Sequence, residues 1–236
     1  MSGRENKAKR KESGIFSDNI VKDKNNNWIK PMTKGQRSLI KSIQQNKVTF
    51  ALGPAGTGKS FLGMCIGLQM LRDGEVDKIV LTRPAVETGQ GLGFLPGDVT
   101  EKYEPYLKPF FDAMDIILNT AEKKKFKDKI ELAPLGFLRG STQRCYLILD
   151  EAQNCTLTEL QMLITRLGEG GKFVINGDPE QSDIKNSGLR QTVNALKQIE
   201  GIGYHEMGVD DIVRDEIIKE AILAFRKLKT DLREKK

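Results

Sequence analysis

Residues 53–60 read Gly53-Pro54-Ala55-Gly56-Thr57-Gly58-Lys59-Ser60. This stretch fits the pattern G-x-x-x-x-G-K-[ST] at every position. Its glycines let a loop wrap closely and turn successive backbone N–H groups inward, which makes an anion nest at the N-terminus of a helix. An apolar, strand-like run precedes the loop at 48–52, and a helical pattern follows it at 59–71. Strand, loop and helix in this order predict a phosphate-binding P-loop; an ordinary glycine-rich turn is the alternative.

The side chains of the predicted P-loop suit a nucleoside triphosphate with a metal ion. Lys59 supplies a point charge for the β- and γ-phosphates, and the Ser60 hydroxyl is placed to ligate Mg²⁺. We therefore expect ATP and Mg²⁺ as ligands and Lys59 as a catalytic residue. The expected nucleotide-binding residues in this part of the chain are Gly53, Pro54, Ala55, Gly56, Thr57, Gly58, Lys59, Ser60 and Phe61.

Two carboxylates stand where a second apolar run, 145–149, ends. At the end of a strand, Asp150 can orient the metal and its waters, and Glu151 is suited to polarise an attacking water molecule. Small-molecule kinases must exclude water, so the pair favours hydrolysis over phosphoryl transfer. An acidic loop or a helix cap is the alternative interpretation.

A third apolar run, 173–175, leads into the polar stretch 176–181. A polar group after a core strand can detect the γ-phosphate of a nucleotide, and Gln181 is the candidate. Asn-Gly and Asp-Pro pairs in the same stretch are strong turn formers. A plain turn is therefore an equally good interpretation on composition alone.

Further short apolar runs alternate with helical patterns along the chain. Short apolar strands spaced by helices indicate a parallel sheet covered on both faces. The sequence thus predicts an α/β fold of the P-loop NTPase class, with a mainly parallel sheet between two helical layers. Besides those already given, the expected strands are 78–81 and 129–132, and the expected helices are 100–121, 156–167, 187–199 and 211–228.

The composition argues against several other classes of protein. A length of 236 residues fits one domain. No run approaches the roughly 20 apolar residues of a membrane-spanning helix, and the N-terminus lacks the apolar stretch of a signal peptide, so we expect a cytoplasmic location. A single histidine and three cysteines without a C-x-x-C pair argue against a zinc cluster or a disulfide framework. We expect each cysteine to be reduced and buried.

The net charge of +6 is carried by the two ends of the chain. Residues 1–30 hold eight Lys and Arg against four Asp and Glu, and residues 226–236 hold six against two. We expect a flexible basic arm at 1–30, with order beginning near Trp28 or Met32, an ATPase domain at 31–228 and a basic tail at 229–236. Such ends can bind phosphate backbones by counterion release, or serve only as solubilising ends.

Taken together, the motifs resemble the PhoH family of P-loop ATPases, which is related to superfamily 1 RNA helicases and has a RecA-like core. The chain is similar to the compact forms carried by bacteriophages, without the RNA-binding extension or nuclease domain of some relatives. The likeness covers about residues 32–228. It rests on these ordered blocks: Thr33 to Gln36, Gly53 to Ser60, Thr82 to Ala85, Gly91 to Gly97, Ala133 to Gly140, Asp150 to Asn154, Gly177 to Gln181 and Asp211 to Arg214.

The resemblance implies roles for three polar residues. Gln36 is expected to read adenine, and Gln181 to sense the γ-phosphate. Arg214 matches the late arginine of the family, which could act as an arginine finger on a neighbouring subunit's nucleotide; a helix-surface arginine is the alternative. Two departures are Gly136, where the family more often has alanine, and residues 215–216, which lack the usual His-Pro. The second weakens the inference at Arg214.

The resemblance also implies a nucleic-acid partner, with single-stranded RNA expected and DNA as an alternative. Arg83 and Arg139 lie in blocks expected to face nucleic acid or a subunit boundary; structural salt bridges are the alternative. The block 89–97 and a basic run are further candidates, although such a run is more often a solvated helix end. The run consists of Lys123, Lys124 and Lys125 with Lys127 and Lys129. Four aromatic residues could offer stacking surfaces: Tyr103, Tyr106, Phe110 and Phe111. The alternative is a core position, because Tyr103, Tyr106, Phe110 and Ile117 fall at helical spacing.

The chain has room for one motor lobe, whereas monomeric helicases close the nucleotide site between two. An arginine finger would then come from a neighbour, and a head-to-tail ring, which we expect to be a hexamer, would supply it. The leading function is an RNA-dependent ATPase that acts as a translocase or helicase. The alternative is a nucleotide-dependent scaffold that recruits an RNA-processing nuclease and turns ATP over slowly. The Asp150-Glu151 pair argues against a third reading, a small-molecule kinase.

Overall fold

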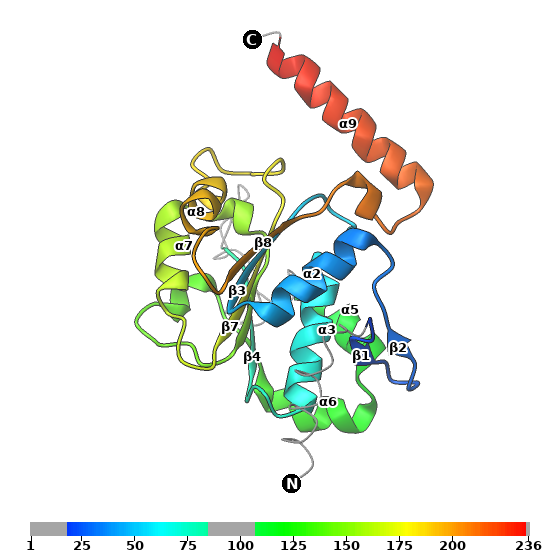
Figure 1. Ribbon diagram of the computed structural model, residues 1–236, viewed down its shortest axis with the longest axis vertical. Coiled ribbons are helices and arrows are strands. Elements are labelled where there is room, and N and C mark those ends of the chain that lie inside the picture. Colours follow the sequence, from blue (N-terminus) through cyan, green and yellow to red (C-terminus); the bar gives the residue numbers. More distant parts are fainter. Residues whose placement is uncertain (1–17, 85–106, 235–236) are drawn as a thin grey trace, which may run out of the picture.

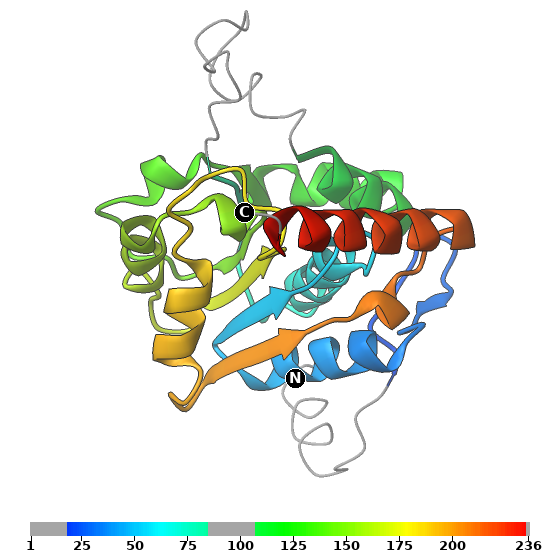
Figure 2. The same cartoon turned by 90° about the horizontal axis from the view of Figure 1, so that it is seen from above.

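The computed structural model describes residues 18–84 and 107–234. Six strands form one sheet in the order β5-β4-β6-β7-β3-β8, and all neighbouring strands in it run parallel. Figure 2 shows three of them, β7, β3 and β8, side by side and pointing the same way. The strands are β3 (Val48–Leu52), β4 (Ile79–Thr82), β5 (Ile130–Leu132), β6 (Tyr146–Leu149), β7 (Lys172–Gly177) and β8 (Ile202–Glu206).

Helices cover both faces of this sheet (Figure 1). Along β6, Tyr146 and Ile148 join one hydrophobic cluster, while Leu147 and Leu149 join the other. Because both faces are buried, the strands read as continuous apolar runs. One cluster includes side chains of α2 (Lys34–Gln45), α3 (Lys59–Arg72), α5 (Lys108–Ile117) and α6 (Thr120–Phe126); the other includes α7 (Leu157–Ile164) and α8 (Leu189–Leu196). The predicted three-layer α/β fold with a mainly parallel sheet is confirmed.

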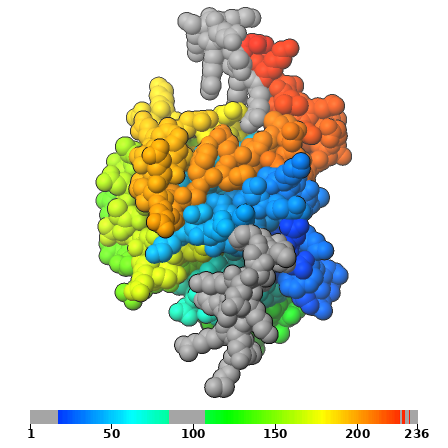
Figure 3. Space-filling view, viewed as in Figure 1, coloured from blue at the N-terminus to red at the C-terminus, as the bar shows by residue number. Residues whose placement is uncertain are grey.

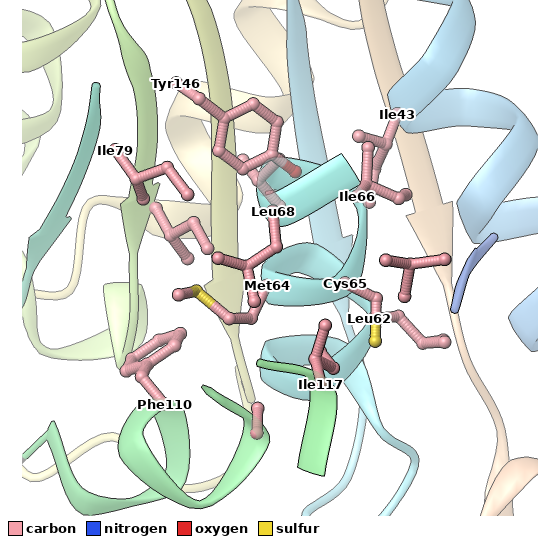
Figure 4. Close-up of a cluster of buried hydrophobic side chains, with 14 of the residues drawn as sticks. Ile43, Leu62, Met64, Cys65, Ile66, Leu68, Ile79, Phe110, Ile117 and Tyr146 are labelled. Atoms are coloured by element: carbon pink, nitrogen blue, oxygen red, sulfur yellow. The ribbon is translucent and has the colours of Figure 1, made fainter. Parts of the chain in front are cut away.

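Figure 4 shows side chains of α3, the helix that follows the P-loop, packed in one cluster with Tyr146 of β6. The Tyr146 hydroxyl donates a hydrogen bond to the carbonyl of Gly63 at 2.8 Å. A Cβ added at Gly67 would lie 2.7 Å from the Tyr146 ring, so only glycine fits there. This close packing fixes α3, and with it the P-loop at its N-terminus, to the centre of the sheet.

The prediction of a flexible arm over residues 1–30 is wrong for the part that the structure describes. Strands β1 (Val21–Lys22) and β2 (Trp28–Ile29) form a small antiparallel hairpin, and Ile20 and Val21 are buried. The Asp23 carboxylate accepts hydrogen bonds from the backbone N–H groups of Asn25 and Asn27 and closes the turn. The asparagine run is therefore a side-chain-stabilised turn.

Other differences lie at helix ends. The predicted helix 100–121 is, where described, two helices, because Asn119 caps a new one with its side chain on the Glu122 N–H. The last helix, α9 (Glu216–Glu234), begins after residue 211 and continues through most of the predicted tail 229–236. Short 3-10 turns complete the description: η3 (Lys127–Lys129), η4 (Leu135–Leu138), η5 (Ala152–Asn154) and η6 (Val209–Asp211).

The three cysteines, Cys65, Cys145 and Cys155, are free and buried, as expected. Burial raises the pKa of the Cys145 thiol to about 11, which keeps it protonated near neutral pH. Within residues 18–84 and 107–234, none of the helices combines the length and apolar character needed to cross a bilayer.

Arg72, at the end of α3, ties together three segments of the helical layer. Its guanidinium pairs with both carboxylate oxygens of Glu122 on α6, at 2.8 and 2.9 Å. It also donates to the carbonyls of Lys22 in β1 and Ile117 in α5, at 2.6 and 2.9 Å. Because the side chains of this pair are only 17% and 24% exposed, the interaction is poorly screened by water.

We expect Arg72→Met to lower the free energy of unfolding by about 2–3 kcal/mol, because it leaves a half-buried carboxylate and two carbonyls without their donor. Lys78→Met is the matched control, since it removes an ion pair to Glu131 in which both side chains are more than 40% exposed, and should cost less than about 1 kcal/mol. Urea unfolding followed by circular dichroism measures both. Equal losses in the two variants would contradict the role assigned to Arg72.

Candidate nucleotide-binding site

The carboxyl ends of four parallel strands bring the P-loop and several charged residues to one edge of the sheet. The P-loop follows β3, and Arg83 follows β4. Asp150 and Glu151 follow β6, while Asp178 follows β7. In open α/β sheets this edge is where ligands bind.

The backbone of the P-loop has the form that a phosphate requires. Gly53, Gly56 and Gly58 have φ angles of +135°, +84° and +87°, a region that favours glycine. A Cβ at Gly53 would lie 2.5 Å from the Met207 carbonyl oxygen, so the loop passes close to the end of β8. The Thr57 hydroxyl donates to the carbonyl of Pro54 at 3.0 Å and closes the loop on itself. The result is a glycine-lined cradle at the N-terminus of α3, which suits a phosphate group.

The Lys59 ammonium is folded into this cradle. It donates to the carbonyls of Gly53 and Pro54 at 2.7 and 2.8 Å. Burial lowers the pKa of Lys59, and the carboxylates of Asp178, Asp150 and Glu151 oppose that shift. The ammonium is therefore bound to backbone carbonyls of the P-loop, with acidic groups nearby.

Ser60 and Asp150, the two predicted metal ligands, are in direct contact. The Ser60 hydroxyl donates to Oδ1 of Asp150 at 2.9 Å. Burial raises the pKa of Asp150, the neighbouring Glu151 adds to this shift, and the Ser60 hydroxyl opposes it. One hydroxyl and one carboxylate beside a phosphate cradle fit Mg²⁺, which usually takes one or two protein ligands and fills its remaining positions with water and phosphate.

Glu151 adopts a left-handed backbone conformation, with φ of +55°. Its Oε2 accepts a hydrogen bond from the side-chain amide of Gln153, and its Oε1 lies 3.5 Å from a guanidinium nitrogen of Arg83. The carboxylate is thus held from both sides beside Asp150. For Arg83, this contact supports the salt-bridge alternative.

Gln36 is 3% exposed and lies beside the P-loop. Its amide donates to the Thr57 carbonyl at 3.1 Å and accepts from the Met32 N–H at 2.7 Å. This places Gln36 against the P-loop. Adenine recognition by Gln36 stays a prediction.

Arg214 lies over the P-loop of its own chain. A Cβ added at Gly56 would be 3.1 Å from Cδ and Nε of Arg214, and the Val213 N–H donates to the Gly56 carbonyl at 3.0 Å. The preceding segment is held to the start of α2, where Asp211 accepts from the Thr33 hydroxyl at 2.6 Å. Figure 3 shows this segment lying against α2 on the surface. The expectation that Arg214 serves a neighbouring subunit therefore gains no support from its position, which is next to its own cradle.

Two residues that the sequence did not single out belong to the site. Asp178 is the acidic neighbour that affects Lys59 most, and Gln153 contacts Glu151. Gln181 instead has an exposed side chain, and its N–H closes a turn on the Asp178 carbonyl at 3.0 Å. That turn was the alternative interpretation of residues 176–181; the sensor role of Gln181 stays a prediction.

The nucleic-acid candidates are scattered. Arg139 is exposed and follows η4. The lysines of α6 lie near Arg72, at the far end of a 14-residue α3 that is about 20 Å long. Phe110 and Ile117 are fully buried, so the core interpretation holds for them.

The block 89–97, Tyr103 and Tyr106 lie outside the described residues. The three lysines of α6 are exposed. Lys123 pairs with Asp115, and Lys125 lies over the Phe126 ring. Lys124 lies between them in the sequence.

Comparison with known proteins gives a family match over most of the chain. Residues 28–226 match the model for PhoH-like protein. A PhoH-like protein of Bacillus subtilis (strain 168) is 41% identical over 219 residues, covering 90% of this chain and 69% of that protein. Protein PhoH of Escherichia coli (strain K12) is 34% identical over 200 residues, covering 81% of this chain and 56% of that protein. Like the Synechocystis relative, of which 65% is covered, these proteins are longer than the region they share with this chain.

Solved structures support the fold. The large terminase from a thermophilic bacteriophage is similar with a TM-score of 0.51 and 13% identity, over 82% of this chain and 50% of the terminase. The same terminase in complex with ADP has a TM-score of 0.50 over 81% of this chain and 49% of its own. Because the sequence identity is low, the likeness shows a shared RecA-like P-loop fold and nothing beyond the fold. With a family match over residues 28–226 and relatives at 41% identity, this chain is a member of the PhoH-like protein family and a P-loop NTPase.

Proposed function

We propose that the chain hydrolyses ATP in a reaction that depends on Mg²⁺. The observation that carries this proposal is the hydrogen bond of 2.9 Å between Ser60 and Asp150, with Glu151 beside it and Lys59 across the cradle. Motifs that lie 90 residues apart in the sequence form one arrangement. The terminase bound to ADP, a protein of the same fold, also supports a nucleotide ligand.

Each residue has a role that follows from its place. The P-loop N–H groups and Lys59 bind the phosphates, and the lysine exchanges its carbonyl partners for phosphate oxygens. Ser60 and Asp150 would hold Mg²⁺, which would neutralise charge on the phosphates. Glu151 accepts a proton from the attacking water as a general base. Arg214, lying over Gly56, adds positive charge beside the phosphates of its own chain.

Glu151→Gln should bind ATP normally and lose turnover by about 100-fold or more, because an amide cannot accept the proton from water. Steady-state phosphate release measures turnover, and binding of a non-hydrolysable ATP analogue measures affinity. Glu169→Gln is the control, since it makes the same chemical change at an exposed position in the loop before β7. Full activity of the Glu151 variant would exclude this residue as the base.

We propose in addition that single-stranded RNA stimulates hydrolysis. Arg83 would couple RNA binding to hydrolysis, because its guanidinium lies 3.5 Å from the Glu151 carboxylate. Arg83 also belongs to a block that the family resemblance leads us to expect at nucleic acid or at a subunit boundary. A phosphate group of RNA that attracts Arg83 would alter the surroundings of the catalytic carboxylate. A scaffold that recruits an RNA-processing partner, with slow turnover, is the alternative.

ATP turnover with and without single-stranded RNA tests this part of the proposal. We expect several-fold stimulation by RNA, and less by single-stranded DNA, with the stimulation absent in the Glu151→Gln variant. Because backbone contacts release counterions, stimulation should weaken as the salt concentration rises. Hydrolysis that is indifferent to both polymers would favour the scaffold.

We also propose that the chain assembles as a ring, with the hexamer as the expected size. Helix α9 projects away from the body in Figure 1, and the residues of α9 are absent from both core clusters of the described chain. A single helix of 19 residues is marginally stable in water unless it packs against something. Its exposed apolar side chains are Ile217, Ile218, Leu223, Phe225 and Leu228. A neighbouring copy bound to α9 would lie close to Arg214 and the nucleotide site.

Light scattering after gel filtration should give the mass of six 26.4 kDa chains. Phe225→Ser combined with Leu228→Ser should dissociate the assembly, because it removes two apolar contacts from a helix whose burial depends on the neighbour. Lys227→Ser, at an exposed position between them, is the matched control and should leave the mass unchanged. A monomer with full ATPase activity would rule out the ring.

A further inference from the structure

Gln153 connects the two loops that follow β6 and β7. The residue is 2% exposed, and both ends of its side-chain amide are used. The oxygen accepts from the Asp178 N–H at 2.9 Å, and the nitrogen donates to Oε2 of Glu151. A buried amide with both ends hydrogen-bonded has little freedom to turn, so it fixes the distance between its two partners.

On one side, the amide is attached to a well-fixed part of the site. Asp178 is 7% exposed and follows β7 directly. A Cβ at Gly177 would lie 3.2 Å from both the backbone nitrogen and the side-chain oxygen of Gln153, so the two loops are in close contact. Since β7 pairs with both β3 and β6, its carboxyl end keeps a constant position relative to the P-loop.

On the other side, the amide restrains the orientation of the Glu151 carboxylate. Glu151 is about one third exposed at its side chain, and its second oxygen meets Arg83 only at 3.5 Å. The hydrogen bond from Gln153 is therefore the closest side-chain restraint on this carboxylate among the described residues. A neutral N–H donor orients a carboxylate while leaving its negative charge in place, which a general base needs.

We propose that Gln153 is a positioning residue for hydrolysis, which holds the Glu151 carboxylate at a fixed place relative to the loop after β7. The inference rests on the proposed function, because it requires Glu151 to act as the base. Gln153 itself touches neither nucleotide nor water in this role. Its effect is to keep the base in the orientation in which it accepts a proton, and small losses of such orientation can cost large factors in rate.

The neighbouring residue offers a matched control. The Asn154 side chain also binds the loop after β7, donating to the Asp183 carboxylate at 2.9 Å and accepting from the Asp183 N–H at 2.8 Å. Its hydrogen bond to Glu151 runs between backbone groups, from the Asn154 N–H to the Glu151 carbonyl at 2.9 Å. A change of the Asn154 side chain therefore loosens the same loop while leaving the Gln153–Glu151 bond in place.

Gln153→Glu and Gln153→Met separate the two functions of the amide. The glutamate keeps an acceptor for the Asp178 N–H but removes the donor to Glu151; the methionine keeps the length and removes both bonds. We expect kcat for ATP to fall about 100-fold in each, with KM and the affinity for a non-hydrolysable ATP analogue within about threefold of the wild type. Asn154→Ala should lower the melting temperature but keep kcat within about threefold.

The outcomes distinguish this inference from the function on which it rests. Wild-type kcat in both Gln153 variants, together with an inactive Glu151→Gln, would overturn the positioning role and leave ATP hydrolysis by Glu151 intact. An Asn154→Ala variant as slow as the Gln153 variants would also overturn it, since general loosening of the loop would then explain the loss. An active Glu151→Gln would remove both proposals at once.

Discussion

The parallel pairing of β3 with β7 on one side and β8 on the other determines where the P-loop lies. Leu52, the last residue of β3, stands level with Gly177 and with Glu206. Three chain segments therefore leave the sheet together, and they crowd so closely that Gly53 has no room for a side chain beside Met207. Both faces of β3 are buried, so a shift of one residue would turn every side chain to the opposite hydrophobic cluster and disrupt the packing there.

The central strands and the helix after the P-loop could be predicted because burial on both faces gives them an unmistakable apolar sequence. Strand β8 and the N-terminal hairpin lack that signal. Strand β8, at the edge of the sheet, contains Tyr204 and Glu206, which are exposed, so its sequence does not form an apolar run. The hairpin near the N-terminus buries only a few apolar side chains, among them Ile20 and Val21, and its turn is closed by the Asp23 side chain. The polar composition of residues 1–30 therefore predicts disorder instead.

Within the site, the sequence identified the residues that are neighbours along the chain. The P-loop and the Asp150-Glu151 pair each form a short motif, and the structure brings them together at Ser60. Gln153 and Asp178 are 25 residues apart, and nothing in the local sequence indicates that their loops touch. The position of Arg214 over its own P-loop likewise depends on the path of the chain after β8, which Asp211 fixes through its bonds to the start of α2.

The left-handed backbone at Glu151 lowers the conformational stability of the folded chain at a position where we propose a catalytic base. A glutamate held at φ of +55° stores about 1 kcal/mol or more of unfavourable conformational energy. Glycine or asparagine would relieve that strain, yet neither could serve as the base. Under the proposed function, the glutamate is kept despite this conformational cost because hydrolysis needs a base at this position.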